Sequence, residues 1–83
     1  MYSTYILYSK SHDRYYVGHC ADMASRLMRH NAGKVLSTKA YAPWILCYEE
    51  KYPTKSEASR REREIKAKKS RKYLEWLLSH SGA

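Results

Sequence analysis

The chain has 83 residues and carries 16 Lys and Arg against 8 Asp and Glu, so its formal net charge is +8. That length predicts a single domain, which buries only roughly 60–65% of the surface that its unfolded chain exposes. Such a thin core leaves little room for a deep metabolite pocket and favours a shallow groove. The excess of positive charge favours a polyanion such as nucleic acid, which a basic surface attracts without sequence preference.

Cysteine content and hydropathy exclude two further classes of protein. Cys20 and Cys47 form no Cys/His cluster, which argues against a zinc site, and unpaired cysteines suit a reducing cytoplasmic location. No apolar run approaches the roughly 18 residues of a membrane span, and the first residues lack the pattern of a signal peptide. We therefore expect a cytoplasmic protein without a membrane role, with a monomer as the favoured state.

The first half of the chain predicts two strands and a helix. Thr4–Ser9 and Tyr15–Cys20 are rich in β-branched and aromatic residues, and the polar stretch 10–14 between them is typical of a hairpin loop. A helix is expected to begin after the N-cap residue Asp22 and to end near Gly33, where the backbone can leave the right-handed region.

The second half predicts one strand and two helices. Lys34–Pro43 has no clean period and is expected to be a loop, whereas Trp44–Tyr48 is expected to be a well-buried strand. Thr54, with a glutamate three residues later, forms a capping box that opens a helix to about Lys69. Arg71–Ser79 predicts a last helix with one apolar side.

These elements predict an α+β fold in the order ββαβαα, with a three-stranded antiparallel sheet flanked by helices. Residues 1–79 are expected to form one domain, and residues 80–83 a loose tail.

Glu62 is the first side chain that could carry chemistry. Helical spacing places it with Ala58 and Ile65 on the inward stripe of its helix, where a carboxylate needs a partner. The choices are a bound cation or a structural salt bridge with Lys66, and the position alone leaves both open. The other glutamates of this helix are expected to pair with the basic residue four positions on, Glu57 with Arg61 and Glu64 with Lys68.

Arg26 and His30 lie four residues apart and therefore share one side of the first predicted helix. A guanidinium and an imidazole that point together into a groove could hold a phosphate, because arginine presents a rigid fork of donors to oxyanions. The alternative is an ordinary boundary between the polar and apolar faces of a helix.

Tyrosine usage is unusual, because the chain has nine Tyr and no Phe. Aromatic residues that only fill a core would include Phe, so the bias indicates that some hydroxyl groups are used. Tyr5 and Tyr16 fall on adjacent antiparallel strands, where a phenol could orient or deprotonate a water beside a metal ion. Packing in the core is the alternative for both.

A dense run of basic residues from Arg60 to Lys72 is expected to contact the backbone of DNA or RNA without reading bases. With basic residues elsewhere in the chain, the expected nucleic-acid contacts are His19, Arg29, Lys34, Lys39, Arg61, Lys66, Lys69, Arg71 and Lys72.

Five short motifs occur in order along residues 2–72. They are Ser3-Thr4-Tyr5, Tyr16-Val17-Gly18, Arg26 followed by His30-Asn31 and Gly33, Pro43-Trp44 followed by Leu46, and Glu57-Ala58 leading through Arg60-Arg61-Glu62 to Ile65-Lys66. Together they resemble the GIY-YIG nucleases, above all the small single-domain members akin to the N-terminal nuclease module of the bacterial excision-repair excinuclease. The chain departs from the family pattern at Ser3, which replaces a glycine, and at Leu74, where some members carry asparagine.

The resemblance implies a nuclease that cuts phosphodiester bonds in DNA, with RNA as a possible substrate and repair as a possible role. It implies one Mg²⁺ or Mn²⁺ ion held by Glu62, and Arg26 stabilising charge on the phosphoryl oxygens. Tyr5, Tyr16 and His30 would position and activate the attacking water, with the general base left open. Gly18 would be the strand glycine that a ligand or backbone approaches closely.

Two other functions stay open at this point. A domain of this fold could bind nucleic acid without cutting it, and a basic helix could instead meet an acidic protein partner.

Overall fold

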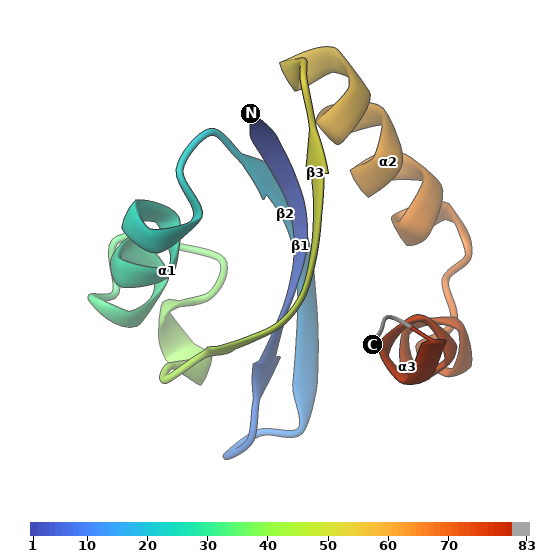
Figure 1. The fold of residues 1–83 in the computed structure, drawn as a ribbon. Coiled ribbons are helices and arrows are strands. Elements are labelled where there is room, and N and C mark those ends of the chain that lie inside the picture. Colours follow the sequence, from blue (N-terminus) through green and yellow to red (C-terminus); the bar gives the residue numbers. More distant parts are fainter. Residues whose placement is uncertain (81–83) are drawn as a thin grey trace.

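The computed structural model describes residues 1–80 and shows a three-stranded antiparallel sheet with helices on both faces (Figure 1). Along the chain the elements are β1 (Tyr2–Ser9), β2 (Arg14–Cys20), α1 (Met23–Asn31), the 3₁₀ helix η1 (Lys39–Tyr41), β3 (Ile45–Tyr52), α2 (Lys55–Ala67) and α3 (Arg71–His80). The predicted α+β class and the order ββαβαα are confirmed.

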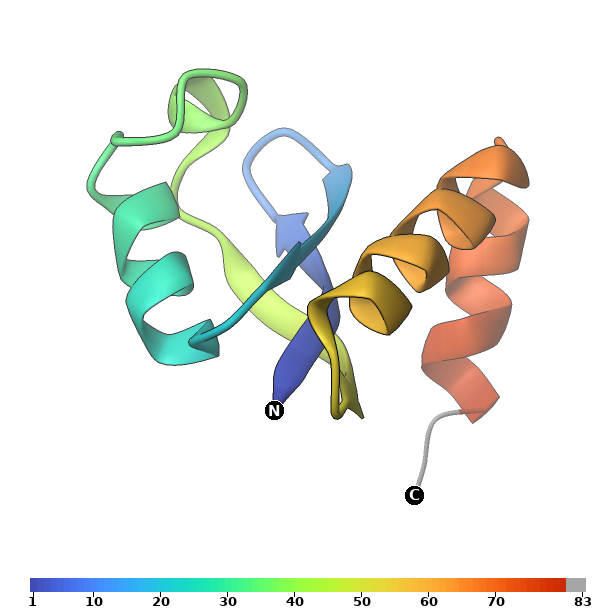
Figure 2. The same cartoon turned by 90° about the horizontal axis from the view of Figure 1, so that it is seen from above.

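Strand β1 is the centre of the sheet, because the strand order is β2-β1-β3. Helix α1 covers one face, whereas α2 and α3 cover the other (Figures 1 and 2). With both faces covered, every residue from Ser3 to Leu7 is buried. Successive side chains of a strand point to opposite faces, so β1 contributes to two separate cores.

The two cores follow this alternation. On the α1 side, Tyr5 and Leu7 pack with Trp44 and Cys20. On the side of α2 and α3, Ile6 packs with residues of three other elements, namely Val17, Ile65 and Leu77.

Helix α1 is fixed at both ends by side chains near it in sequence. The carboxylate of Asp22 accepts a hydrogen bond from the backbone N–H of Ser25 at 3.2 Å, which caps the first turn. At the other end, Asn31 accepts from the N–H of Trp44 at 2.5 Å and donates to its carbonyl at 3.1 Å. Gly33 follows with φ of +74°, as the predicted helix end requires.

Helix α2 begins after Thr54, whose hydroxyl accepts from the N–H of Glu57 at 3.2 Å, so the predicted cap is confirmed. The helix ends at Ala67, two residues before the predicted end. The reason is that Lys69 adopts φ of +46°, outside the right-handed helical region, and turns the chain into α3.

Several other features differ from the expectations, and β1 and β2 begin at Tyr2 and Arg14 rather than at Thr4 and Tyr15. Strand β3 runs over Ile45–Tyr52 and is mostly half-buried, because it lies at an edge of the sheet. The predicted loop Lys34–Pro43 contains η1. His80 belongs to α3, which corrects the predicted start of the tail, and residues 81–83 lie outside the described part of the chain.

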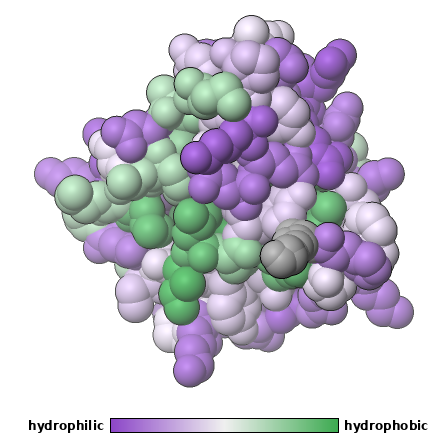
Figure 3. Space-filling view, in the orientation of Figure 1, coloured by the Kyte–Doolittle hydropathy of each residue, from purple (hydrophilic) through white to green (hydrophobic). Residues whose placement is uncertain are grey.

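The surface reflects this layering. On the face shown in Figure 3, hydrophilic residues prevail over α2, and hydrophobic residues gather near the start of β3. Ile45, at that start, is 54% exposed, as suits an edge strand. Within residues 1–80, none of the helices combines the length and apolarity needed to cross a bilayer.

Candidate active site

A groove of about 570 Å³ lies beside the C-terminal half of β2, between α1 and α2. Its lining includes four of the five predicted catalytic residues, Tyr5, Tyr16, Arg26 and Glu62. These side chains come from β1, β2, α1 and α2 respectively, so the fold brings together residues that are far apart in sequence. The fifth, His30, is fully buried and lies behind Tyr5.

Gly18 makes room for the two phenols. It pairs with Tyr5 in the register of β1 and β2. A Cβ atom at Gly18 would lie 2.6 Å from Tyr5 Oη, closer than real side chains pack, and 3.0 Å from Tyr16 Cε2. The glycine is therefore needed for space, because both rings lie over it at the rim of the groove.

Tyr5 and His30 form the first links of a buried hydrogen-bond chain. Tyr5 Oη lies 3.0 Å from His30 Nε2, and His30 Nδ1 lies 2.7 Å from Thr38 Oγ1. Thr38 donates its only hydroxyl proton to the carbonyl of Val35 at 3.3 Å. One tautomer keeps all three contacts: Nδ1–H donates to Thr38, and Nε2 accepts from the phenol of Tyr5.

Burial keeps this pair uncharged at neutral pH. Desolvation raises the pKa of Tyr5 well above its ordinary value, and the nearby phenol of Tyr16 adds to the rise, whereas Arg26 opposes it. Desolvation, Arg26 and Arg29 all lower the pKa of His30. The resting state is therefore a phenol that donates to a neutral imidazole.

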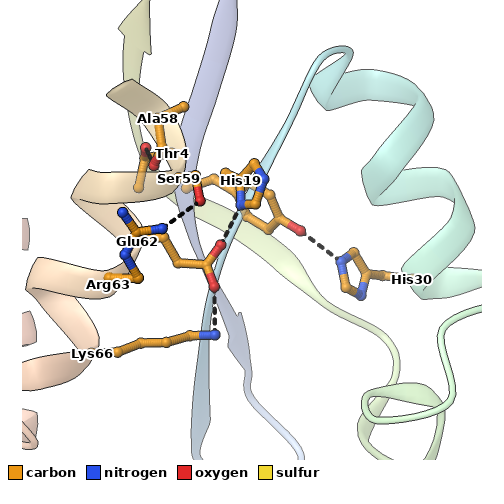
Figure 4. A network of polar contacts seen from close by, with 9 residues as sticks. Thr4, His19, His30, Ala58, Ser59, Glu62, Arg63 and Lys66 are labelled. Atoms are coloured by element: carbon orange, nitrogen blue, oxygen red, sulfur yellow. Dashed lines mark hydrogen bonds and ion pairs between the residues drawn. The ribbon is translucent and has the colours of Figure 1, made fainter. Parts of the chain in front are cut away.

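Glu62 projects from α2 toward β2, and its carboxylate is bound on both oxygens (Figure 4). Oε1 accepts from His19 Nδ1 and Oε2 from Lys66 Nζ, each at 2.6 Å. The side chain is 17% exposed. Partial burial alone would raise the pKa of Glu62, but the hydrogen bonds from Lys66 and His19 outweigh it and lower the pKa. The carboxylate is therefore ionised at neutral pH, and the salt bridge with Lys66, one of the two alternatives for Glu62, is present.

The donor set around Glu62 suits a cation that keeps most of its water. Within residues 1–80, no group of three or more His, Cys, Asp or Glu side chains is placed to hold a metal ion. Mg²⁺ is commonly held by one or two carboxylates plus waters and substrate phosphates, and an ionised Glu62 in an open groove fits that pattern.

Arg26 lies on the opposite wall of the groove from Glu62. In the described part of the chain, no hydrogen bond or ion pair engages its guanidinium group, and the side chain is half-buried. A smaller hollow of about 260 Å³ shares Arg26 and continues to Arg29. Two arginines therefore line one continuous edge on the wall opposite the carboxylate.

The predicted nucleic-acid contacts separate into three groups. His19 lines the groove, Lys66 binds Glu62 at its edge, and Arg29 continues the edge. Exposed lysines lie farther along the chain, at Lys34 and Lys39 before β3 and at Lys69 and Lys72 around the start of α3. Arg71 is half-exposed and bridges Asp13 and Glu75.

Arg61 turns away from the groove. It donates from Nε and Nη2 to the carboxylate of Glu50 on β3, at 2.9 and 3.2 Å, and is 23% exposed. This pairing neutralises the charge of Arg61, so we remove Arg61 from the proposed nucleic-acid contacts. The expected pair of Arg61 with Glu57 does not form, because Glu57 accepts from Thr54 at the helix cap.

Two other glutamate contacts differ from expectation. Glu64 lies 3.6 Å from Arg61 rather than with Lys68, whose ammonium group sits 5.3 Å from the centre of the Tyr73 ring. Lys68 is the C-cap residue of α2, which ends at Ala67.

Sequence reasoning missed several residues of the site. Tyr2, Cys20, Ala21 and Lys55 complete the lining of the groove, and Thr38 is the buried partner of His30. The sequence did contain a signal for Lys55, because it stands seven residues before Glu62 and therefore lies two helical turns away on the same side of α2. Thr38 had no such signal, because the loop that holds it has no periodic pattern.

Comparison with known proteins gives a family-level match. The GIY-YIG catalytic domain family matches residues 1–74. A UPF0213 protein of Staphylococcus haemolyticus is 46% identical over 52 residues, which are 61% of this chain and 63% of that protein. A UPF0213 protein of Staphylococcus aureus is 43% identical over 60 residues, 71% of this chain and 73% of that protein.

A solved structure extends the match. The solution NMR structure of UPF0213 protein BH0048 from Bacillus halodurans is 34% identical, with a TM-score of 0.62, and the match covers 100% of this chain and 88% of that one. The names of these relatives state no activity. The chain spans about 63% of the length of the Staphylococcus haemolyticus relative.

Gly18→Ala should push the Tyr5 ring out of place and destabilise the fold by about 1–3 kcal/mol, a usual cost of overpacking. The penalty should be smaller in a Tyr5→Phe background, because the closest contact is with the phenol oxygen. Urea unfolding of the four proteins measures both values. An equal loss of stability on Gly18→Ala in the parent protein and in Tyr5→Phe would contradict the close approach of Tyr5 Oη to position 18.

His30 should be a neutral imidazole with its proton on Nδ1 at pH 7, as long-range ¹H–¹⁵N spectra can show. Because its folded pKa lies below the unfolded value of about 6.5, the unfolded state binds more protons. The free energy of unfolding should therefore fall as the pH drops below about 6.5. His30→Gln should remove this part of the pH dependence. An imidazolium at neutral pH would refute the assignment.

Proposed function

The chain belongs to the GIY-YIG catalytic domain family, and on that premise we propose that it is an endonuclease that hydrolyses phosphodiester bonds in DNA with one Mg²⁺ or Mn²⁺ ion. The observation that carries the proposal is the convergence of Tyr5, Tyr16, Arg26 and Glu62 on one groove from four elements. The net charge of +8 on the chain favours a phosphate polymer as substrate.

Glu62 would hold the ion, because it is the ionised carboxylate of the groove. When bound there, the ion would supply Lewis-acid polarisation of a phosphoryl oxygen. Lys66 and His19 would keep the carboxylate oriented between catalytic cycles, and Lys66 would be free to approach a phosphate oxygen once it leaves Glu62.

Tyr5 and His30 would move the proton of the attacking water. The phenol proton passes to His30 Nε2, which already faces it at 3.0 Å, and Tyr5 Oη then accepts a proton from water. Thr38 holds the imidazole in the accepting tautomer through Nδ1. Tyr16, whose ring centre lies 6.3 Å from that of Tyr5, would position the water at the rim.

Arg26 would bind the scissile phosphate opposite Glu62. Its guanidinium group is free of ion pairs within residues 1–80, so binding a phosphate breaks no salt bridge of the fold. Donors placed where negative charge develops are a large source of rate enhancement in phosphoryl transfer. Arg29 would extend this edge toward the neighbouring backbone.

The substrate and cellular role are proposed more broadly. DNA is the favoured polymer, with RNA a second possibility, and a structure-specific role in repair follows from the resemblance to an excision-repair nuclease module. Cys20 and Cys47 are both unpaired thiols, as a reducing cytoplasm would keep them.

A binding module without turnover is the second candidate. The observation that favours it is the occupation of both Glu62 oxygens by Lys66 and His19, since a cation must compete with them. Such a protein would bind the same polymer in the same groove and release it uncut.

Cleavage of flapped, branched and single-stranded DNA in Mg²⁺ or Mn²⁺ tests the proposal. Glu62→Gln and Arg26→Ala should each lower the rate by about 100-fold or more, as for loss of one transition-state contact. Glu64→Gln is the matched control, because this glutamate of α2 is 56% exposed and should leave the rate unchanged.

Three outcomes separate the candidates. Equal products from the parent protein and Glu62→Gln would identify a contaminating nuclease. Binding without products would favour the binding module. Failure to bind DNA or RNA even at low salt would favour a protein-interaction domain.

Lys66→Met should tighten Mn²⁺ binding about two- to fivefold, because it removes a competing, half-exposed ammonium group while keeping the apolar stem. Glu62→Gln should abolish binding. Paramagnetic broadening of backbone resonances near His19 and Glu62 measures both effects. Broadening centred outside the groove, or weaker binding by Lys66→Met, would contradict the proposed metal position.

A further inference from the structure

The groove extends beyond Glu62 to the first turn of α2. There its lining is completed by Tyr2 from β1 and Lys55 from α2. Figures 1 and 2 both place the start of β1 beside the start of α2. This end of the groove contains no residue to which the proposed chemistry assigns a role.

Lys55 is a cation without an ionic partner in the described part of the chain. It stands two helical turns before Glu62, about 10 Å along the axis at 1.5 Å per residue. That spacing is too long for the pairing that Lys66 makes one turn after Glu62. Across residues 1–80 the Lys55 ammonium group makes no ion pair or hydrogen bond, and the side chain is exposed.

Tyr2 places an aromatic ring at the same end. It lies on the face of β1 that Thr4 shares, and the Thr4 hydroxyl donates to the carbonyl of Ala58 on α2 at 2.7 Å. Tyr2 therefore faces α2 rather than α1. Its ring is half-buried and has no aromatic partner among the residues that the structure describes.

The order of charges along the groove suits one strand of nucleic acid. On α2 the carboxylate of Glu62 stands between Lys55, two turns before it, and Lys66, one turn after it, and Arg26 lies on the opposite wall. A carboxylate flanked by cations suits a polyanion if one metal ion binds both the carboxylate and the central phosphate, while the cations bind the neighbouring phosphates. An aromatic ring beside a cation is the usual contact for a nucleotide in single-strand grooves.

Resting on the proposed function, we infer that Lys55 and Tyr2 form a subsite for the nucleotide next to the scissile phosphate. Lys55 pairs with the phosphate of that nucleotide, and the Tyr2 ring contacts its sugar or base. The subsite aligns the strand along α2, so that the linkage to be cut comes to lie at Glu62.

Binding of a fluorescent single-stranded oligonucleotide to Glu62→Gln protein tests this inference without turnover. Adding Lys55→Ala should weaken binding and reduce the slope of log Kd against log salt by about 0.7, the value for one phosphate contact on a single strand. Tyr2→Leu should weaken binding about threefold or more and leave the slope unchanged, because stacking involves no counterion release. Lys51→Ala, an exposed lysine outside the groove, is the matched control and should change neither quantity.

A neutral methylphosphonate linkage locates the contact. Placed at successive linkages of a short oligonucleotide, it should abolish the effect of Lys55→Ala at one position only. Equal effects of Lys55→Ala and Lys51→Ala on binding would overturn the subsite. It would also be overturned if poly-glutamate competed for binding as strongly as the unlabelled oligonucleotide does. ¹H–¹⁵N spectra and the Tyr2→Phe variant, which keeps the ring, separate loss of contact from loss of fold.

The two proposals fail in different ways. If the parent protein cuts DNA but Lys55→Ala behaves like Lys51→Ala, the subsite is wrong and the nuclease stands. If no DNA is cut but the binding effects appear as described, the subsite stands and the nuclease is wrong.

Discussion

Two hydrogen bonds from adjacent residues of the central strand hold the candidate site together. Thr4 donates to the carbonyl of Ala58 on α2, and Tyr5 donates to His30 on α1, at 2.7 and 3.0 Å. Because neighbouring side chains of a strand point to opposite faces, β1 fastens one helix on each side of the sheet. Glu62 lies one turn after Ala58, and Arg26 one turn before His30, so these two bonds set the distance between the opposite walls of the groove.

The same arrangement accounts for the charge state of the site. Tyr5 and His30 sit in the sheet-to-helix interface, where desolvation keeps them neutral. Glu62 sits at the sheet edge, where His19 and Lys66 keep it ionised. The neutral pair of Tyr5 and His30 thus lies beside the ionised carboxylate that would bind the cation. Their charge states differ because the pair is desolvated, whereas Glu62 has two close cationic partners.

Much of this arrangement was predictable from local patterns. Thr54 and Asp22 marked helix starts because capping is a short-range interaction, and helical spacing placed Glu62 inward. The length of β3 was not predictable, since its last residues are strand only through pairing with β1. The partial burial of Glu50 was not predictable either, because Arg61, Tyr48 and Tyr52 converge on it only in the tertiary fold.

Because of the Glu50–Arg61 ion pair, the net charge is distributed unevenly around α2. On the side toward β3 the guanidinium of Arg61 is neutralised by the carboxylate of Glu50, whereas on the side of the groove the ammonium group of Lys55 has no ionic partner within residues 1–80. Under the proposed function, an approaching polyanion would meet an unpaired cation on the side of the groove and a neutralised one on the side of β3. Lys55 would thereby help to set the angle of encounter.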